Sequence, residues 1–128
     1  MNLSFDKIFV FGNPDLPMDS LPLRIMPRLQ KSFPQTGFVT VDPNEEWEVP
    51  KELVAIDTAQ GIEKVEVFDD LDKFEKVPRT TMHDFDALTN LRYLKKLGKL
   101  GSVRIIGVPP SLSEDEAVTS VAEKLRKL

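Results

Sequence analysis

The chain lacks cysteine altogether, which excludes disulfides, thiolate metal sites and a cysteine nucleophile. Long apolar runs are missing as well, and none approaches the roughly 18 residues that a membrane-spanning helix needs. The N-terminal stretch MNLSFDKIFVFG has only a short apolar run after one acid and one base, so we expect no signal peptide. These absences favour a soluble cytoplasmic protein that has no membrane partner.

An excess of basic residues is also missing. Seventeen lysines and arginines stand against twenty-one aspartates and glutamates, a net charge of −4. This balance argues against a nucleic-acid partner, which normally needs a basic face. A local basic cluster is present at Arg92, Lys95, Lys96 and Lys99.

Length and composition are those of an ordinary globular protein. The chain has 128 residues, of which 41% are hydrophobic and 30% charged. A chain of this length buries roughly two-thirds of its unfolded surface around a single core. We expect a single domain over residues 1–128, functioning as a monomer.

Five segments have the pattern of strands. Four are short apolar runs bounded by glycine, proline or aspartate, which is typical of strands buried on both faces. A fifth, KVEVF, alternates apolar and charged residues as an edge strand does. The predicted strands are residues 8–11, 38–41, 53–56, 64–68 and 103–108.

The first predicted helix begins near Asp19 or Ser20. Pro22 suits its first turn, where the missing N–H costs nothing, whereas Pro27 lies inside the helix and should kink it. Its apolar stripe consists of Leu21, Ile25, Leu29 and Phe33, which recur every four residues.

Two further helices are predicted. The second starts just after His83. The third begins with a capping box from Ser113 to Glu116. Their apolar stripes are Phe85, Leu88, Leu91 and Leu94 in the second, and Val118, Val121, Ala122 and Leu125 in the third. Strands alternating with helices predict an α/β fold, a three-layer domain whose mostly parallel twisted sheet of about five strands is covered by helices on both faces.

Three candidate site residues follow from this arrangement, because ligands of open α/β sheets bind beyond the carboxyl ends of the strands. Asp19 follows the first strand, Asp57 follows the third, and His83, the only histidine, precedes the second helix. Each also has an ordinary structural explanation. Asp19 could cap a helix, Asp57 could begin the turn in DTAQG, and a lone histidine can be a surface or structural residue.

Together, two carboxylates and one imidazole suit nickel, iron, manganese or zinc with open coordination positions. No fourth ligand stands out, so such a site would bind a metal weakly or act on a metal brought by another molecule. Other chemistries lack their motifs. There is no phosphate-binding loop, no dinucleotide fingerprint after Gly12, and no serine-hydrolase elbow.

The sequence resembles the [NiFe]-hydrogenase maturation endopeptidases over nearly its whole length. The resemblance begins with a strand leading to Gly12-Asn13 and Asp19. It continues through VAIDTAQG with Asp57, VEVFDD, and TTMHDFDAL with His83, and closes with RIIGVPP and the terminal helix.

This resemblance implies an endopeptidase that removes the C-terminal extension of a hydrogenase large-subunit precursor. It assigns Asp19, Asp57 and His83 as the catalytic residues that engage nickel, and Gly12 and Asn13 as the substrate loop. The nickel is carried by the precursor, so the free protein is not expected to hold it tightly.

The chain departs from the family pattern after its first strand, where members usually carry an acidic pair followed by Gly-x-Gly. Met18 replaces the first acid, and Ser20 and Pro22 replace the glycines, which stiffens the loop. These departures leave open a relative that docks the precursor without cutting it.

Two other classes share single features with the chain. Gly12-Asn13-Pro14 is similar to the start of peptidyl-tRNA hydrolases, but their histidine-asparagine pair is absent. Asp57 is placed like a phosphoacceptor, but Asp19 lies too far from its strand for a receiver domain, and VPP replaces the expected lysine.

Overall fold

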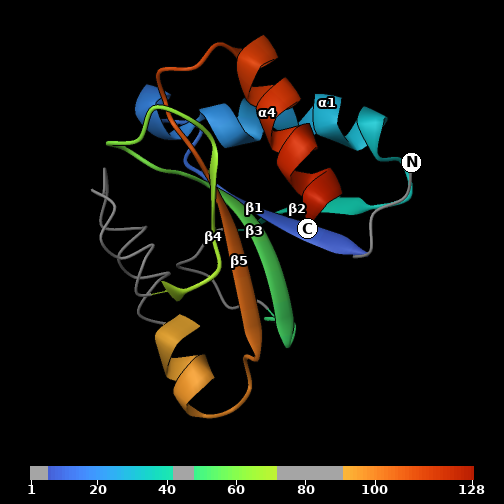
Figure 1. Ribbon diagram of the computed structural model, residues 1–128, viewed down its shortest axis with the longest axis vertical. Helices are drawn as coiled ribbons and strands as arrows, with labels where there is room; N and C mark the ends of the chain where they lie inside the picture. Colours follow the sequence, from blue (N-terminus) through green and yellow to red (C-terminus); the bar gives the residue numbers. More distant parts are fainter. Residues whose placement is uncertain (1–5, 42–47, 72–90) are drawn as a thin grey trace.

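The structure is a computed structural model that describes residues 6–41, 48–71 and 91–128 (Figure 1). All five predicted strands are present, each with bounds within two residues of those expected. The elements are β1 (Lys7–Phe11), the 3₁₀ turn η1 (Pro17–Asp19), α1 (Leu21–Ser32), β2 (Gly37–Val41), β3 (Glu52–Thr58), β4 (Glu66–Phe68), β5 (Ser102–Val108) and α4 (Glu114–Lys127).

The strands form one sheet in the order β2-β1-β3-β5-β4. The pairs β1–β2, β1–β3 and β3–β5 are parallel, and only β4 runs antiparallel, beside β5. This confirms the mostly parallel α/β sheet and the edge position of the alternating segment. One boundary differs from the prediction, because β3 does not stop before Asp57 but continues through it to Thr58.

Helices cover both faces of the sheet. Successive residues of each central strand point to opposite faces, so apolar side chains on both faces need cover. On one face, α1 and α4 lie together (Figure 1) and bury Ile25 and Val121 against Ile56. On the other, the helical residues 91–96 bury Leu91 against Ala55. The predicted second helix is confirmed over 91–96. Its earlier positions, Phe85 and Leu88, and His83 before them, lie outside the described residues.

Both fully described helices follow their sequence signals. The capping box of α4 is formed: Glu116 N–H donates to Ser113 Oγ at 3.1 Å and Ser113 N–H donates to Glu116 Oε1 at 3.2 Å. Helix α1 has Pro22 in its first turn and continues through Pro27; the kink remains a prediction. Within the described ranges, no helix is both long and apolar enough to cross a membrane.

Candidate functional site

Asp57 is a buried carboxylate near the carboxyl end of β3. Its side chain is 3% exposed, and its Oδ1 accepts a hydrogen bond from Thr58 N–H at 2.8 Å. It is not the turn residue that the sequence left open, because the turn lies further on, where Gly61 takes a φ of 80°. Asp57 is therefore held in the strand, where the backbone is rigid.

Gly107 of β5 pairs in register with Asp57, and neighbouring partners in a parallel pair share a face of the sheet. A Cβ atom on Gly107 would lie 2.8 Å from both Ala59 Cβ and Phe68 Cε2. Those two side chains thus occupy the space that a Gly107 side chain would take. Beside Asp57, strand β5 therefore contributes only backbone, and the ring of Phe68 from the edge strand β4 covers Gly107.

Asp19 is the last residue of η1 and is 1% exposed. The backbone holds it on both sides: its N–H donates to the carbonyl of Leu16 at 2.9 Å, and its own carbonyl accepts from Asn13 N–H at 2.9 Å. The N-cap position of α1 is occupied by Ser20, not Asp19. Asp19 is therefore not the N-cap of α1, and helix capping does not explain why this acid is buried.

The strand order brings the two acids together at the carboxyl end of the parallel strands. From β1 the chain moves outward on one side to β2, and then returns to place β3 on the other side of β1. The carboxyl ends of β1 and β3 are thus the topological switch point, where open α/β sheets bind their ligands. Asp57 is near the end of β3 and Asp19 is in the turn that follows β1.

Buried acids of this kind are uncommon in proteins unless they are paired or bind a cation. His83, the third candidate, lies outside the described residues. Among the residues that are described, no group of three or more potential ligands gathers into a metal site. The roles assigned to Asp19, Asp57 and His83 therefore remain predictions, although two of the three lie at the edge where they were expected.

A cavity of about 540 Å³ adjoins this edge and includes the predicted substrate loop. It opens between the segment after β1 and the end of β2. Its walls are Gly12, Asn13, Pro14, Asp15, Leu23, Thr40 and Val41. Sequence patterns gave no signal for the last three residues. The pairing of β1 with β2 brings Thr40 and Val41 beside the loop, and Leu23 reaches it from α1.

The turn that carries Asp19 also exposes apolar side chains. Leu16 is 39% exposed and Met18 is 56% exposed. By contrast, the basic cluster of Arg92, Lys95 and Lys96 lies on the helical residues that lead into the start of β5, at the opposite end of the sheet (Figure 1). That cluster is not part of the candidate site.

No protein-family model and no curated protein matches this sequence. Among solved structures, the chain is similar to the hydrogenase maturating endopeptidase HybD from E. coli, with a TM-score of 0.65 and 14% sequence identity. The match covers 96% of this chain and 93% of that chain. The chain therefore has the α/β fold of a hydrogenase maturating endopeptidase, which confirms the fold implied by the sequence resemblance.

Proposed function

We propose that the protein is a processing endopeptidase that removes the C-terminal extension of a [NiFe]-hydrogenase large-subunit precursor. One observation carries the proposal: two buried carboxylates, Asp19 and Asp57, stand at the topological switch point of a sheet whose fold matches HybD over almost its full length. Both acids lie where open α/β sheets bind their ligands, which supports a role for them in the site.

In this proposal the nickel belongs to the substrate. The oxygen atoms of Asp19 and Asp57 and an imidazole nitrogen of His83 bind the nickel that the precursor already carries. Three ligands bind a free ion weakly and leave positions open. The precursor supplies its own ligands as well, so a stable complex forms only when the metal is already in place. Selectivity for loaded precursor follows directly from the incomplete ligand set.

Peptide hydrolysis then requires a water molecule to add to the scissile carbonyl and the C–N bond to break, with the leaving amine taking a proton. A bound metal can polarise that carbonyl or lower the pKa of the water. The contribution of the chain is to hold the two acids at the carboxyl end of the sheet, one near the end of β3 and one in η1. The cavity beside Gly12 and Asn13 provides room for the extended segment next to them.

The test is a trimming assay on nickel-loaded precursor, followed by intact mass of the large subunit. Asp19→Asn, Asp57→Asn and His83→Ala should each slow trimming roughly 100-fold or more, the usual cost of losing a group that takes part in the chemistry. Matched controls are Asp6→Asn and Glu52→Gln, exposed acids at the amino ends of the same two regions, before β1 and at the start of β3. They should trim like wild type. Full cleavage by all three site variants would sink the proposal.

A second candidate function is docking without cleavage, and the exposure of Leu16 and Met18 beside Asp19 favours it. Exposed apolar side chains of this size suit contact with another protein. The same assay separates the two functions. An inactive relative would bind the loaded precursor and leave its mass unchanged.

A further inference from the structure

Ser20 occupies the N-cap position of α1 without capping the helix. A serine there normally has an extended backbone and accepts a hydrogen bond from the N–H of the second or third helical residue. Here the backbone is helical, with φ −103° and ψ −15°, and no capping bond from this side chain is present in the described structure. Pro22, the second helical residue, has no N–H to offer.

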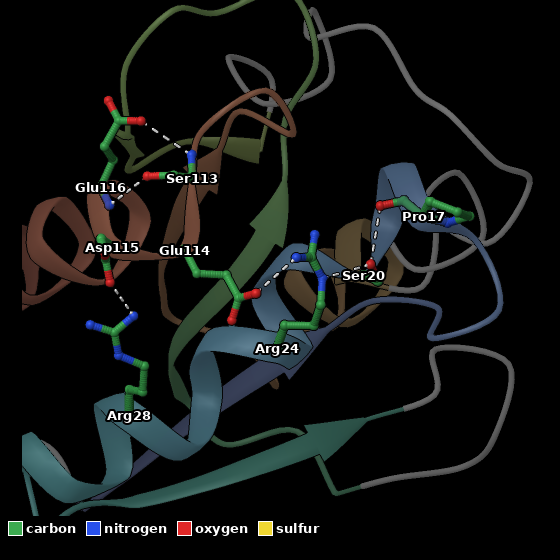
Figure 2. Close-up of polar contacts among 8 residues, drawn as sticks. All are labelled: Pro17, Ser20, Arg24, Arg28, Ser113, Glu114, Asp115 and Glu116. Atoms are coloured by element: carbon green, nitrogen blue, oxygen red, sulfur yellow. Dashed lines mark hydrogen bonds and ion pairs between the residues drawn. The ribbon is translucent and has the colours of Figure 1, made fainter.

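The hydroxyl of Ser20 instead bonds back into the preceding turn (Figure 2). Its Oγ donates to the carbonyl oxygen of Pro17 at 3.1 Å and accepts from Arg24 Nε at 3.1 Å. Arg24 lies one helical turn further along α1. The serine therefore connects the helix to the 3₁₀ turn that carries Asp19.

The connection extends to α4. Arg24 Nη1 contacts Glu114 Oε2 at 3.2 Å, and Glu114 is the first residue of α4 (Figure 2). A continuous series of polar contacts thus runs from the start of α4, through Arg24 and Ser20, to the carbonyl of Pro17.

The turn η1 needs this support because it has only three residues, Pro17–Asp19, and 3₁₀ hydrogen bonds are poorly aligned. The C-terminal end of η1 is held by the hydrogen bond from Asn13 N–H to the Asp19 carbonyl. The N-terminal end of η1 is held by the hydrogen bond from Ser20 Oγ to the Pro17 carbonyl. Along the chain, the Cα atom that carries the Asp19 side chain lies between these two attachments. A binding constellation works only when its groups are held within about 0.5 Å of the productive geometry.

We propose that Ser20, Arg24 and Glu114 form a positioning clamp that sets the direction of the Asp19 carboxylate. The activity part of this inference rests on the proposed function. The structural part does not.

The chain supplies a matched control in the Arg28–Asp115 ion pair. It joins the same two helices one turn further along α1, with Arg28 Nη1 2.8 Å from Asp115 Oδ1 (Figure 2). Both pairs are exposed, with side-chain exposures of 47% and 45% for the first and 48% and 87% for the second. Exposed pairs contribute little to stability. Within the described residues, Arg28 bonds neither to Ser20 nor to η1.

The experiment compares Glu114→Gln with Asp115→Asn, and Ser20→Ala with Ser20→Thr, which keeps the hydroxyl. Amide hydrogen exchange at Asp19 and Asn13, followed by NMR, reports the order of η1 without reference to activity. Glu114→Gln and Ser20→Ala should speed exchange at both amides, and lower kcat for precursor trimming about tenfold with a smaller change in KM, because the carboxylate is misdirected. Asp115→Asn should change neither amide exchange nor kcat, and Ser20→Thr should keep both close to their wild-type values.

Equal effects of Glu114→Gln and Asp115→Asn would overturn the clamp, because they would show that the pairs only join α1 to α4. Unchanged exchange in Ser20→Ala would also overturn it. Should Ser20→Ala fail to fold, the comparison of the two exposed acids still decides the question. If wild type does not trim any precursor, the proposed function fails, while the exchange comparison continues to test the clamp.

Discussion

A Cβ atom on Gly12 would lie 2.8 Å from the carbonyl oxygen of Asp19. A Cβ atom essentially never lies this close to a backbone oxygen in a folded protein, so the path of the backbone requires glycine here. After β1 the chain makes a loop, and the backbone of Asp19 comes back so close to Gly12 that only a residue without a side chain fits at position 12. Gly12 therefore permits the close approach of the Asp19 backbone.

Replacing this glycine should disturb both stability and the candidate site. Gly12→Ala would also bring its methyl within 3.0 Å of Leu23 Cγ, and overpacking of this kind typically costs about 1–3 kcal/mol. Urea unfolding measures the cost, and amide exchange at Asp19 measures the displacement. The control is Gly37→Ala, whose Cβ would be 3.6 Å from its nearest neighbour, Asp6 O. Equal stability of the two variants would show that the close approach is not real.

Gly107→Ala should be destabilising for a different reason, because its Cβ meets side chains instead of backbone. The free energy of unfolding should fall by about 1–3 kcal/mol. The double variant Gly107→Ala, Ala59→Gly removes one of the two contacts and should recover part of the loss. A double-mutant cycle measures this coupling. Strictly additive effects would mean that Gly107 and Ala59 do not compete for the same space.

Thr58 should tolerate valine better than its burial suggests. It is 6% exposed, and its Oγ1 is buried without a hydrogen-bond partner in the part of the chain that the structure describes. Removing a buried, unsatisfied hydroxyl is neutral or stabilising, so Thr58→Val should leave the free energy of unfolding unchanged or raise it by about 1 kcal/mol. Thr40→Val, at an exposed position of β2, is the control. A loss above 1 kcal/mol at Thr58 would reveal a bonded hydroxyl.

The capping box of α4 offers a prediction that is independent of the site. Ser113→Ala removes the acceptor for Glu116 N–H and should lower the free energy of unfolding by about 1 kcal/mol. Ser111→Ala, in the exposed loop just before the helix, should have almost no effect. Indistinguishable urea midpoints for the two variants would contradict the cap seen here.

Much of the fold follows from short-range patterns in the sequence. Apolar runs such as 53–56 predict buried strands because each residue must face one of two covered sides. The Ser113–Glu116 spacing predicts the start of α4 because both bonds of a capping box form between neighbouring residues. The expectation that Asp19 and Asp57 lie at one edge needed only one further rule, that parallel strands end on the same side.

What the sequence by itself determined, then, is the five strands, the helices α1 and α4, and the end of the sheet at which the two acids lie. Tertiary structure alone decided the strand order that makes β1 and β3 neighbours, and with it the switch point between Asp19 and Asp57. It also decided that Ser20, a typical helix cap in sequence, bonds back to Pro17 and joins Arg24 and Glu114. The physical reason is the same in both cases. Pairing between distant segments depends on which surfaces meet in three dimensions, and no local pattern contains that information.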